Sequence, residues 1–418
     1  MMKNIFVTIL LLFPWILFGQ SFTNDWIEYD KQYYKFTVYE DGIYRIDYSA
    51  LVDAGIPVSS ISPQQFQIFY KGEEQYIYVE GTGPSDSILS PGEFIEFYGE
   101  KNTGWLDTAW YADPAWHANP NVSIYTDTST YFLTWTSSGQ TNRLGVEDDV
   151  DFTGYVPADY FLHESRQDYY TNYSGGVYWK TGIGNNSVPI YDSEYTETKG
   201  WFSPSFTALS PFYTSTPGIH NSGPNAEAKY VLVGTNLQDH DVDVTIGSGP
   251  ANNHTYNSTK VNKLSYNIPL TYLGGDSTAF IFTPKAPGTD RNAVGYISIK
   301  YAHIFDLGGA SAYKMSVLDN QISTKSFLSI ANFTTSSPCW LFDLTNHKRI
   351  KTTINNGVVR ALVPNSNGEK ECYLSSETST STITELKGVG SMGTAKFTDY
   401  TIIDPDSAYL IISNEKLY

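Results

Sequence analysis

The stretch that decides the fold is residues 34–48, which reads YKFTVYEDGIYRIDY. Apolar and polar side chains alternate over residues 34–39 and again over residues 43–48, as they do in strands that bury one face. Glu40, Asp41 and Gly42 separate the two runs, and Asp and Gly are typical turn residues. The stretch therefore predicts a β-hairpin.

The same pattern continues outward from this stretch, while helical periodicity is almost absent. Residues 67–70 and 75–79 predict a second hairpin, and only residues 48–54 predict a short helix. Aromatic residues reach 15%, with 33 tyrosines, which favours strands. Further strands are predicted over residues 93–99, 130–135, 230–234, 279–282, 295–301, 326–330 and 339–344. Short strands separated by turn residues predict an all-β protein of two or three consecutive β-sandwich-like domains.

Changes in composition divide the chain of 418 residues into segments. Lys3 and a proline-interrupted apolar run predict a signal peptide over residues 1–19. The tail AYLIISNEKLY, residues 408–418, opens with an apolar run without alternation, as in a strand buried on both faces. We therefore expect the chain to be the front part of a longer protein. The predicted segments after the signal are an N-terminal β domain over 20–140, a middle β-sandwich over 150–303, a third β domain over 304–385, and over 386–418 a linker with the first strand of a truncated α/β domain.

The charge balance excludes some classes of partner. Acidic residues outnumber basic ones 44 to 26, and the net charge of −18 argues against nucleic acid and anionic membrane surfaces. No segment after the signal has the length and apolarity of a membrane span. These features predict an exported protein of the cell surface or the extracellular space.

Motifs with known chemistry are scarce. The sequence contains no GxSxG, HExxH or phosphate-binding glycine loop, and none of its seven histidines has metal-ligand spacing with another His or Cys. We predict no catalytic residue and no cofactor, with calcium left open. Asp239, Asp241 and Asp243 alternate along a predicted strand, which makes either a weak calcium site or a solvated strand edge. The cysteines, Cys339 and Cys372, form either a disulfide or two buried thiols.

Two groups of aromatic residues are candidates for binding. They provide either a platform for sugars or packing between loops and a sheet. The first group lies in a loop-like stretch and the second follows residue 168. The members are Trp105, Trp110, Tyr111 and Trp116 in the first group, and Tyr169, Tyr170, Tyr173, Tyr178 and Trp179 in the second.

Several stretches resemble the amino-terminal region of gingipain-type cysteine peptidases of Bacteroidetes, including the sortase of the type IX secretion system. They are DGIYRI at 41–46, Gly72, SPGEFIEFYGE at 90–100, YTDTSTYFL at 125–133, FTDY at 397–400 and AYLIIS at 408–413. The resemblance covers most of the chain after the signal, although the middle region matches only loosely. It implies that the tail is the first strand of a peptidase domain.

In that family the catalytic His and Cys lie within the peptidase domain, which the resemblance places beyond residue 418. The chain alone is therefore expected not to be an enzyme. The resemblance implies a β region that shields or positions its own downstream peptidase domain or binds cell-surface proteins or glycans. It also implies an association with the outer membrane. The alternative is a stand-alone cell-surface module that binds glycans or proteins through the aromatic groups.

Overall fold

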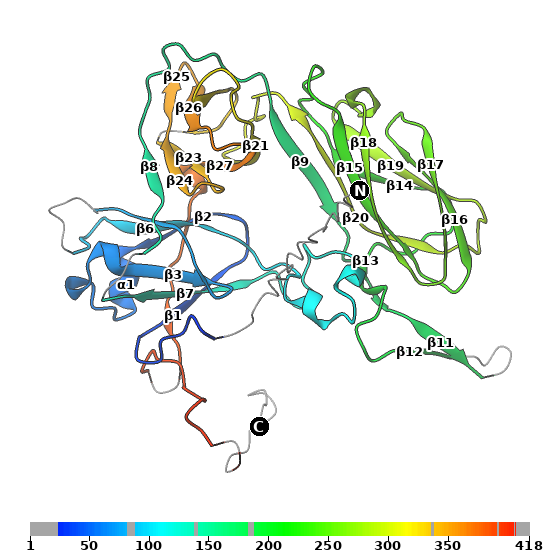
Figure 1. Ribbon diagram of the computed structural model, residues 1–418, viewed down its shortest axis with the longest axis horizontal. Helices are drawn as coiled ribbons and strands as arrows, with labels where there is room; N and C mark the ends of the chain where they lie inside the picture. Colours follow the sequence, from blue (N-terminus) through cyan, green and yellow to red (C-terminus); the bar gives the residue numbers. More distant parts are fainter. Residues whose placement is uncertain are drawn as a thin grey trace, which may run out of the picture.

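The computed structural model describes residues 24–81, 88–137, 141–182, 188–335, 338–390, 393–404 and 406. The predicted signal peptide and the predicted strand in the tail lie outside these residues. Within them the chain is nearly all β, as the sequence predicts, and it forms three sandwiches. Figure 1 shows the first sandwich (blue) and the third (orange) stacked in one lobe, with the middle sandwich (green) in the other.

The first sandwich packs two antiparallel-rich sheets around one core. Its core includes Phe36, Tyr44, Phe97 and Tyr131, all buried. Helix α1 (Tyr48–Asp53) follows β2 and buries Leu51 against this core. One sheet has the order β29 (Lys387–Gly388), β1 (Tyr34–Val38), β7 (Ser129–Trp135), β3 (Phe66–Tyr70) and β4 (Glu73–Glu74). The opposite sheet has the order β28 (Ser381–Thr382), β2 (Gly42–Asp47), β6 (Phe94–Gly99) and β5 (Ile77–Val79).

The predicted hairpin pairing of β1 with β2 is wrong. β1 pairs with β7 and β29 in one sheet, whereas β2 pairs with β6 and β28 in the other. The two strands instead face each other across the core, where the Phe36 ring on β1 lies 5.7 Å from the Phe97 ring on β6. Alternation shows that one face of a strand is buried, and in a sandwich the opposite sheet covers that face. The pattern therefore does not identify the strand that is the hydrogen-bonded neighbour.

The second predicted hairpin forms around Lys71 and Gly72, but it is shorter than predicted. β3 pairs only with the two residues of β4 on that side. The chain then crosses to the other sheet, where β5 pairs with β6. The crossing places residues 74–76 at the edge of the sandwich that faces the third one.

The middle and third sandwiches share one nine-stranded sheet. The two halves of this sheet meet where β9 and β21 pair through Leu162 and Ser316. The order is β18 (Val261–Ile268), β15 (Ala226–Gly234), β20 (Asn292–His303), β9 (Phe161–Asp168), β21 (Ala312–Val317), β27 (Lys370–Ser376), β23 (Cys339–Asp343), β24 (Lys348–Lys351) and β8 (Gly145–Glu147).

A separate sheet covers each half. The middle core buries Tyr230, Phe280 and Phe282 completely, and the third core buries Leu328 and Leu341 completely. Over the middle half lie β14 (Ser210–Ser215), β19 (Ser277–Pro284), β16 (Asp239–Ile246) and β17 (Ala251–Asn257). Over the third half lie β22 (Lys325–Ile330), β26 (Val358–Pro364) and β25 (Thr353–Asn355).

Two small hairpins extend from the middle sandwich (Figure 1). They pair β10 (Asn172–Gly175) with β13 (Lys199–Phe202), and β11 (Tyr178–Thr181) with β12 (Val188–Tyr191). The short 3₁₀ helices are η1 (Val58–Ser60), η2 (Pro63–Gln65), η3 (Asp107–Trp110), η4 (Pro114–Trp116), η6 (Leu270–Tyr272) and η7 (Glu377–Ser379). In the part of the chain that the structure describes, no helix is long and apolar enough to cross a membrane.

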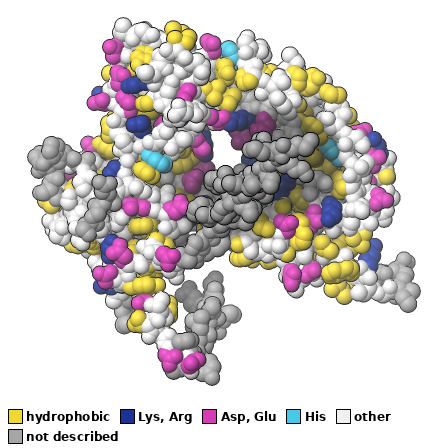
Figure 2. Space-filling model, viewed as in Figure 1, with side chains coloured by type: hydrophobic (Ala, Val, Ile, Leu, Met, Phe, Trp, Pro, Cys, Tyr) yellow, Lys and Arg dark blue, Asp and Glu magenta, His cyan; other side chains and the backbone are white. Residues whose placement is uncertain are grey.

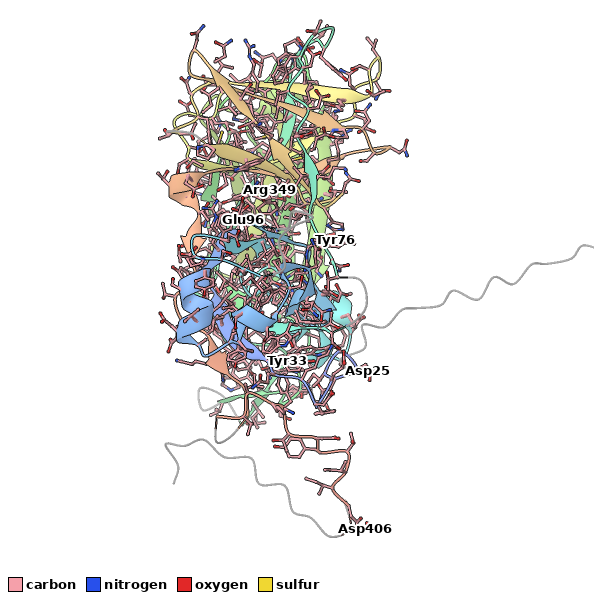
Figure 3. All side chains as sticks on the ribbon, turned by 90° about the vertical axis from the view of Figure 1, so that its left-hand side faces the viewer. Asp25, Tyr33, Tyr76, Glu96, Arg349 and Asp406 are labelled. Carbon is pink, nitrogen blue, oxygen red and sulfur yellow. The ribbon has the colours of Figure 1, made fainter. Side chains whose placement is uncertain are left out.

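A buried charge triad joins the first sandwich to the third. Glu96 on β6 accepts hydrogen bonds from Arg45 Nε at 2.8 Å and from Arg349 Nε of β24 at 2.7 Å. The Arg349 guanidinium also lies 3.5 Å from the centroid of the Trp340 ring and 4.1 Å from that of Tyr78. Figure 3 shows Glu96 and Arg349 at the level where the two sandwiches meet. Because buried charges need close partners, this triad fixes the orientation of one sandwich on the other.

Candidate functional site

The first aromatic group packs between a loop and a hairpin. Trp110 contacts Tyr125 and Tyr195 edge-on, at centroid distances of 5.0 and 5.5 Å. Tyr111 is buried, and its hydroxyl donates to the carbonyl of Lys199 at 2.6 Å. Trp110 itself stays 43% exposed. The group thus ties residues 107–125 to the segment before β13.

The other two tryptophans of this group have separate surroundings. The Lys71 ammonium lies 5.0 Å from the centroid of the Trp105 ring. Trp116 is half-buried at the end of η4, where the Asp113 carboxylate accepts from the Ala115 N–H at 2.9 Å.

The second aromatic group is split between packing and solvent. The Tyr169 ring packs on Phe212, and the Tyr173 ring on Trp201. Tyr170 is exposed. On the projecting hairpin, Tyr178 packs on Tyr191, while Trp179 is 56% exposed and pairs in register with Ile190.

The three aspartates lie on the outer face of β16, as their alternation predicts. Asn253 Nδ2 donates to Asp241 Oδ1 at 2.6 Å and to Asp243 Oδ1 at 2.9 Å, and Lys285 Nζ approaches the same oxygens at 3.4 and 3.2 Å. Asp239 is exposed at the start of the strand. No group of three acidic, His or Cys side chains that could hold a metal ion occurs among the described residues. Asp241 and Asp243 are therefore satisfied by the protein's own amide and ammonium groups.

The two cysteines are buried and free. They lie on neighbouring strands, but Cys339 pairs with Ser376 and Cys372 pairs with Asp343. This register places the thiols four residues apart along the strands, roughly 13 Å, which is beyond the reach of a disulfide. Burial raises the pKa of both thiols, as expected of unreactive core cysteines.

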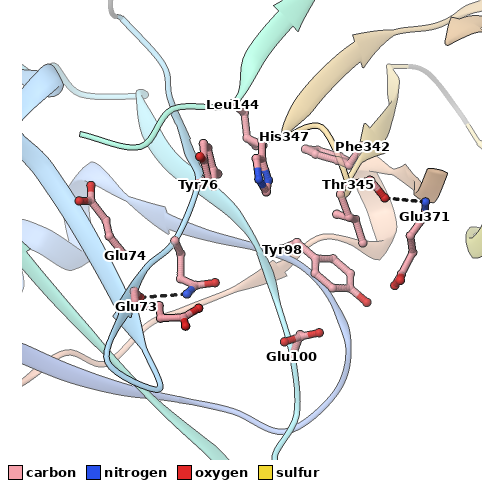
Figure 4. A pocket seen from close by; sticks show the side chains of 12 residues that line it. Glu73, Glu74, Tyr76, Tyr98, Glu100, Leu144, Phe342, Thr345, His347 and Glu371 are labelled. Carbon is pink, nitrogen blue, oxygen red and sulfur yellow. Dashed lines mark hydrogen bonds between the residues drawn. The ribbon is translucent and has the colours of Figure 1, made fainter. Parts of the chain in front are cut away.

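The structure reveals a further candidate that lies between the first and third sandwiches. It is a cavity of about 490 Å³, shown in Figure 4, which we call the inter-sandwich cavity. Its lining residues are Glu73, Glu74, Gln75 and Tyr76 around β4, Tyr98 and Glu100 at the end of β6, Leu144 before β8, Phe342, Leu344, Thr345 and His347 around the β23–β24 turn, and Glu371 on β27. The charge triad described above joins the two sandwiches that form the walls of this cavity.

One wall of the cavity is aromatic. The rings of Tyr76 and His347 are stacked, with centroids 3.5 Å apart and planes inclined by 6°. The turn that carries His347 is closed by Asp343, whose carboxylate accepts from the backbone and side-chain nitrogens of Asn346 at 3.0 and 2.8 Å. Burial lowers the pKa of His347, although Asp343 opposes the change, so the ring is neutral at pH 7.

The rest of the cavity lining is rich in acidic residues. The lining contains four glutamates and no lysine or arginine. Glu74 is engaged by Gln67 Nε2 and the Asn142 N–H, both at 2.9 Å. Burial raises the pKa of Glu100; Lys71 opposes this effect, while Asp41 adds to it. A half-desolvated carboxylate of this kind gains from a cationic neighbour.

The Tyr98 hydroxyl is the unusual polar group of this site. Its oxygen is buried and has no hydrogen-bond partner among the described residues. Burial raises the pKa of Tyr98, and the nearby carboxylates of Asp41, Glu100 and Glu371 raise it further. In Figure 4 the hydroxyl points toward the space between Glu100 and Glu371. Buried hydroxyls normally have a partner, so this one is an unused donor beside an acidic cavity.

Comparisons with known proteins give a fold relationship only. No protein-family model and no curated protein matches the chain. The crystal structure of dimeric latent PorU from Porphyromonas gingivalis matches 86% of this chain with a TM-score of 0.52 at 13% identity. The match covers 33% of the PorU chain, so this chain spans about a third of that protein. The crystal structure of BuGH86 in complex with neoagarooctaose covers 65% of this chain, at 9% identity and a TM-score of 0.18.

Proposed function

We propose that this chain is the non-catalytic amino-terminal β region of a secreted gingipain-like cysteine peptidase precursor of the type IX secretion system, with a PorU-like sortase as a close variant. The observation that carries the proposal is the shared fold with latent PorU over 86% of the chain. Two motifs of the family resemblance support it, because they pair with each other. The DGIYRI motif forms β2, and the FIEFYG part of the second motif forms β6.

The role we propose is to position and shield a peptidase domain that follows in sequence. The segment that leads toward it is anchored by Phe397, whose ring contacts Trp26, Tyr33 and Phe132 at centroid distances of 5.2 to 5.8 Å. A domain joined beyond this anchor would lie beside the first sandwich. The charge triad fixes the first sandwich to the third, so the downstream domain would meet the two sandwiches as one rigid surface. The chain itself supplies no catalytic group, and the precursor is exported to the cell surface.

The test uses the chain from residue 20 onward, purified and mixed with the gingipain-type peptidase domains encoded in the same genome. We expect no cysteine-dependent peptide cleavage by the chain alone, and unchanged behaviour of a Cys339→Ser, Cys372→Ser variant. With one peptidase domain we expect saturable equimolar binding that slows hydrolysis of a fluorogenic peptide. Cleavage by the chain alone, lost when either cysteine is replaced, would refute the proposal.

A stand-alone binding module is the second candidate, and the exposed rings of Trp110 and Trp179 favour it. It predicts saturable binding to a glycan array that falls when either ring is replaced by alanine. Trp135→Ala is not a suitable control, because that ring stacks on Tyr34 in the first sandwich. Tyr213→Ala, at an exposed ring on β14 that belongs to neither aromatic group, is the matched control. Glycan binding without any peptidase binding would replace the first proposal with this one.

A further inference from the structure

We propose that the inter-sandwich cavity binds the cationic side chain of an arginine or lysine presented by a peptide. The site goes beyond the proposed scaffold role and does not depend on it. Its walls combine two kinds of group that recognise organic cations, namely carboxylates and aromatic faces. Figure 4 shows both kinds around one space, with Tyr76 and His347 above Tyr98 and Glu100.

Charge is the first argument. Glu73, Glu74, Glu100 and Glu371 all line the cavity, and no lining residue carries a positive charge at neutral pH. Figure 2 shows acidic side chains over both lobes, and the chain as a whole carries a net charge of −18. A concave site lined by one sign of charge concentrates ligands of the opposite sign.

The chain's own lysine shows that a cation fits at the rim. Lys314 on β21 forms an ion pair with Glu371 and lies 5.8 Å from the centroid of the Tyr98 ring. This ammonium satisfies only one of the carboxylates around the cavity. Glu73 and Glu100 form no ion pair within 4.0 Å in the part of the chain that the structure describes. Lys71 acts on both carboxylates only from a longer distance, because its ammonium lies over the rings of Tyr70 and Trp105.

The unpartnered Tyr98 hydroxyl is the independent argument. It is buried beside the cavity without an acceptor or a donor among the described residues. An incoming guanidinium or ammonium between Glu100 and Glu371 would bring N–H donors to this oxygen. The aliphatic stem of the same side chain would pack on Leu144, Phe342 and Leu344, as lysine and arginine stems do on apolar surfaces.

The experiment titrates the chain with N-acetyl-arginine amide, N-acetyl-lysine amide and the neutral isostere N-acetyl-citrulline amide, followed by calorimetry. We expect the two cationic probes to bind in a salt-sensitive manner and citrulline to bind at least about tenfold more weakly, which corresponds to one lost charge-assisted contact. Equal binding of the cationic and neutral probes, or binding of neither cation, would overturn the proposal. Preferential binding of a neutral oligosaccharide at the cavity would overturn it as well.

Four variants locate the site. Glu100→Gln should weaken arginine-amide binding by about tenfold, whereas Glu194→Gln, at an exposed carboxylate near the hairpins, should leave it unchanged. Tyr98→Phe should weaken binding without destabilising the free protein. Lys314→Gln should strengthen binding because it removes the internal competitor for Glu371. A misfolded variant could not produce this gain, so unchanged or weaker binding by Lys314→Gln would count against the site.

Discussion

At the scale of single residues, Asp319 shows how one carboxylate fastens two loops. It follows β21, and its Oδ2 accepts from the backbone N–H groups of Asn367 and Gly368 at 2.7 and 2.9 Å. Its Oδ1 pairs with the fully buried ammonium of Lys370. Burial alone would raise the pKa of Asp319, but Lys370 and the backbone N–H groups outweigh it and hold the pKa below its usual value.

We predict that Asp319→Asn destabilises the protein at neutral pH by about 1–3 kcal/mol, because it leaves a charged group without its partner. A carboxyl whose pKa is lowered on folding stabilises the fold above its unfolded pKa, and this contribution is lost as the pH falls through the folded pKa. The difference between wild type and variant should therefore be full at pH 7 and shrink below about pH 4. Thermal unfolding between pH 2.5 and 7 measures it, and a pH-independent difference would contradict the prediction.

At the scale of elements, the junction of β9 and β21 depends on a half-buried histidine. His163 on β9 lies with its Nδ1 3.1 Å from the Tyr313 hydroxyl on β21, and its ring centroid is 5.5 Å from that of His303 on β20. Burial lowers the pKa of His163 to about 4, and the neighbouring His303 contributes to the decrease. The two halves of the shared sheet are thus held by a ring that must stay neutral.

Acidification should weaken this junction. Because the pKa of His163 is lowered from about 6.5 to about 4 on folding, its contribution is full above pH 6.5 and is lost as the pH falls toward 4, by up to about 3 kcal/mol. His163→Gln should remove this part of the decline in urea unfolding between pH 7 and 4. The pKa of His303 is lowered too, so a residual slope is expected. A variant with the full wild-type slope would show that His163 does not titrate there.

The sequence predicts the bounds of the strands better than it predicts which strands pair with each other. β6, β7, β22 and β23 match predicted runs closely, because alternation and β-branched or aromatic content can be read from the local sequence. The partners of β1 and β2 were mispredicted, since a buried face does not identify what covers it. The inter-sandwich cavity was missed for a related reason. Its lining comes from residues near 75, 98, 144, 345 and 371, and no local pattern links them.

At the scale of the whole molecule, the lobe that holds the first and third sandwiches depends on one buried carboxylate. Glu96 is 1% exposed and serves both Arg45 and Arg349. Glu377 offers a comparison, because it pairs with the same Arg45 but is 42% exposed. The two glutamates differ in burial and in the number of arginines that each one satisfies.

We predict that Glu96→Gln costs about 3–5 kcal/mol of stability, because Arg349 remains buried without its counter-charge. Glu377→Gln should cost less than about 1 kcal/mol, as exposed ion pairs do. Urea unfolding followed by tryptophan fluorescence compares the two, and small-angle scattering detects separation of the sandwiches. Equal effects of the two substitutions would mean that the triad does not hold the lobe together.

The strands β28 and β29 have a consequence for the order in which this protein is made. Synthesis yields β1 and β2 early, yet Gly388 pairs with Tyr34, and Ser381 pairs with Tyr44. Until those late residues have left the ribosome, both sheets of the first sandwich have an open edge on which other chains can add. We expect nascent chains to need a holding chaperone until synthesis is complete, and fragments that end near residue 140 to aggregate. The domain that is translated first is the one that is completed last.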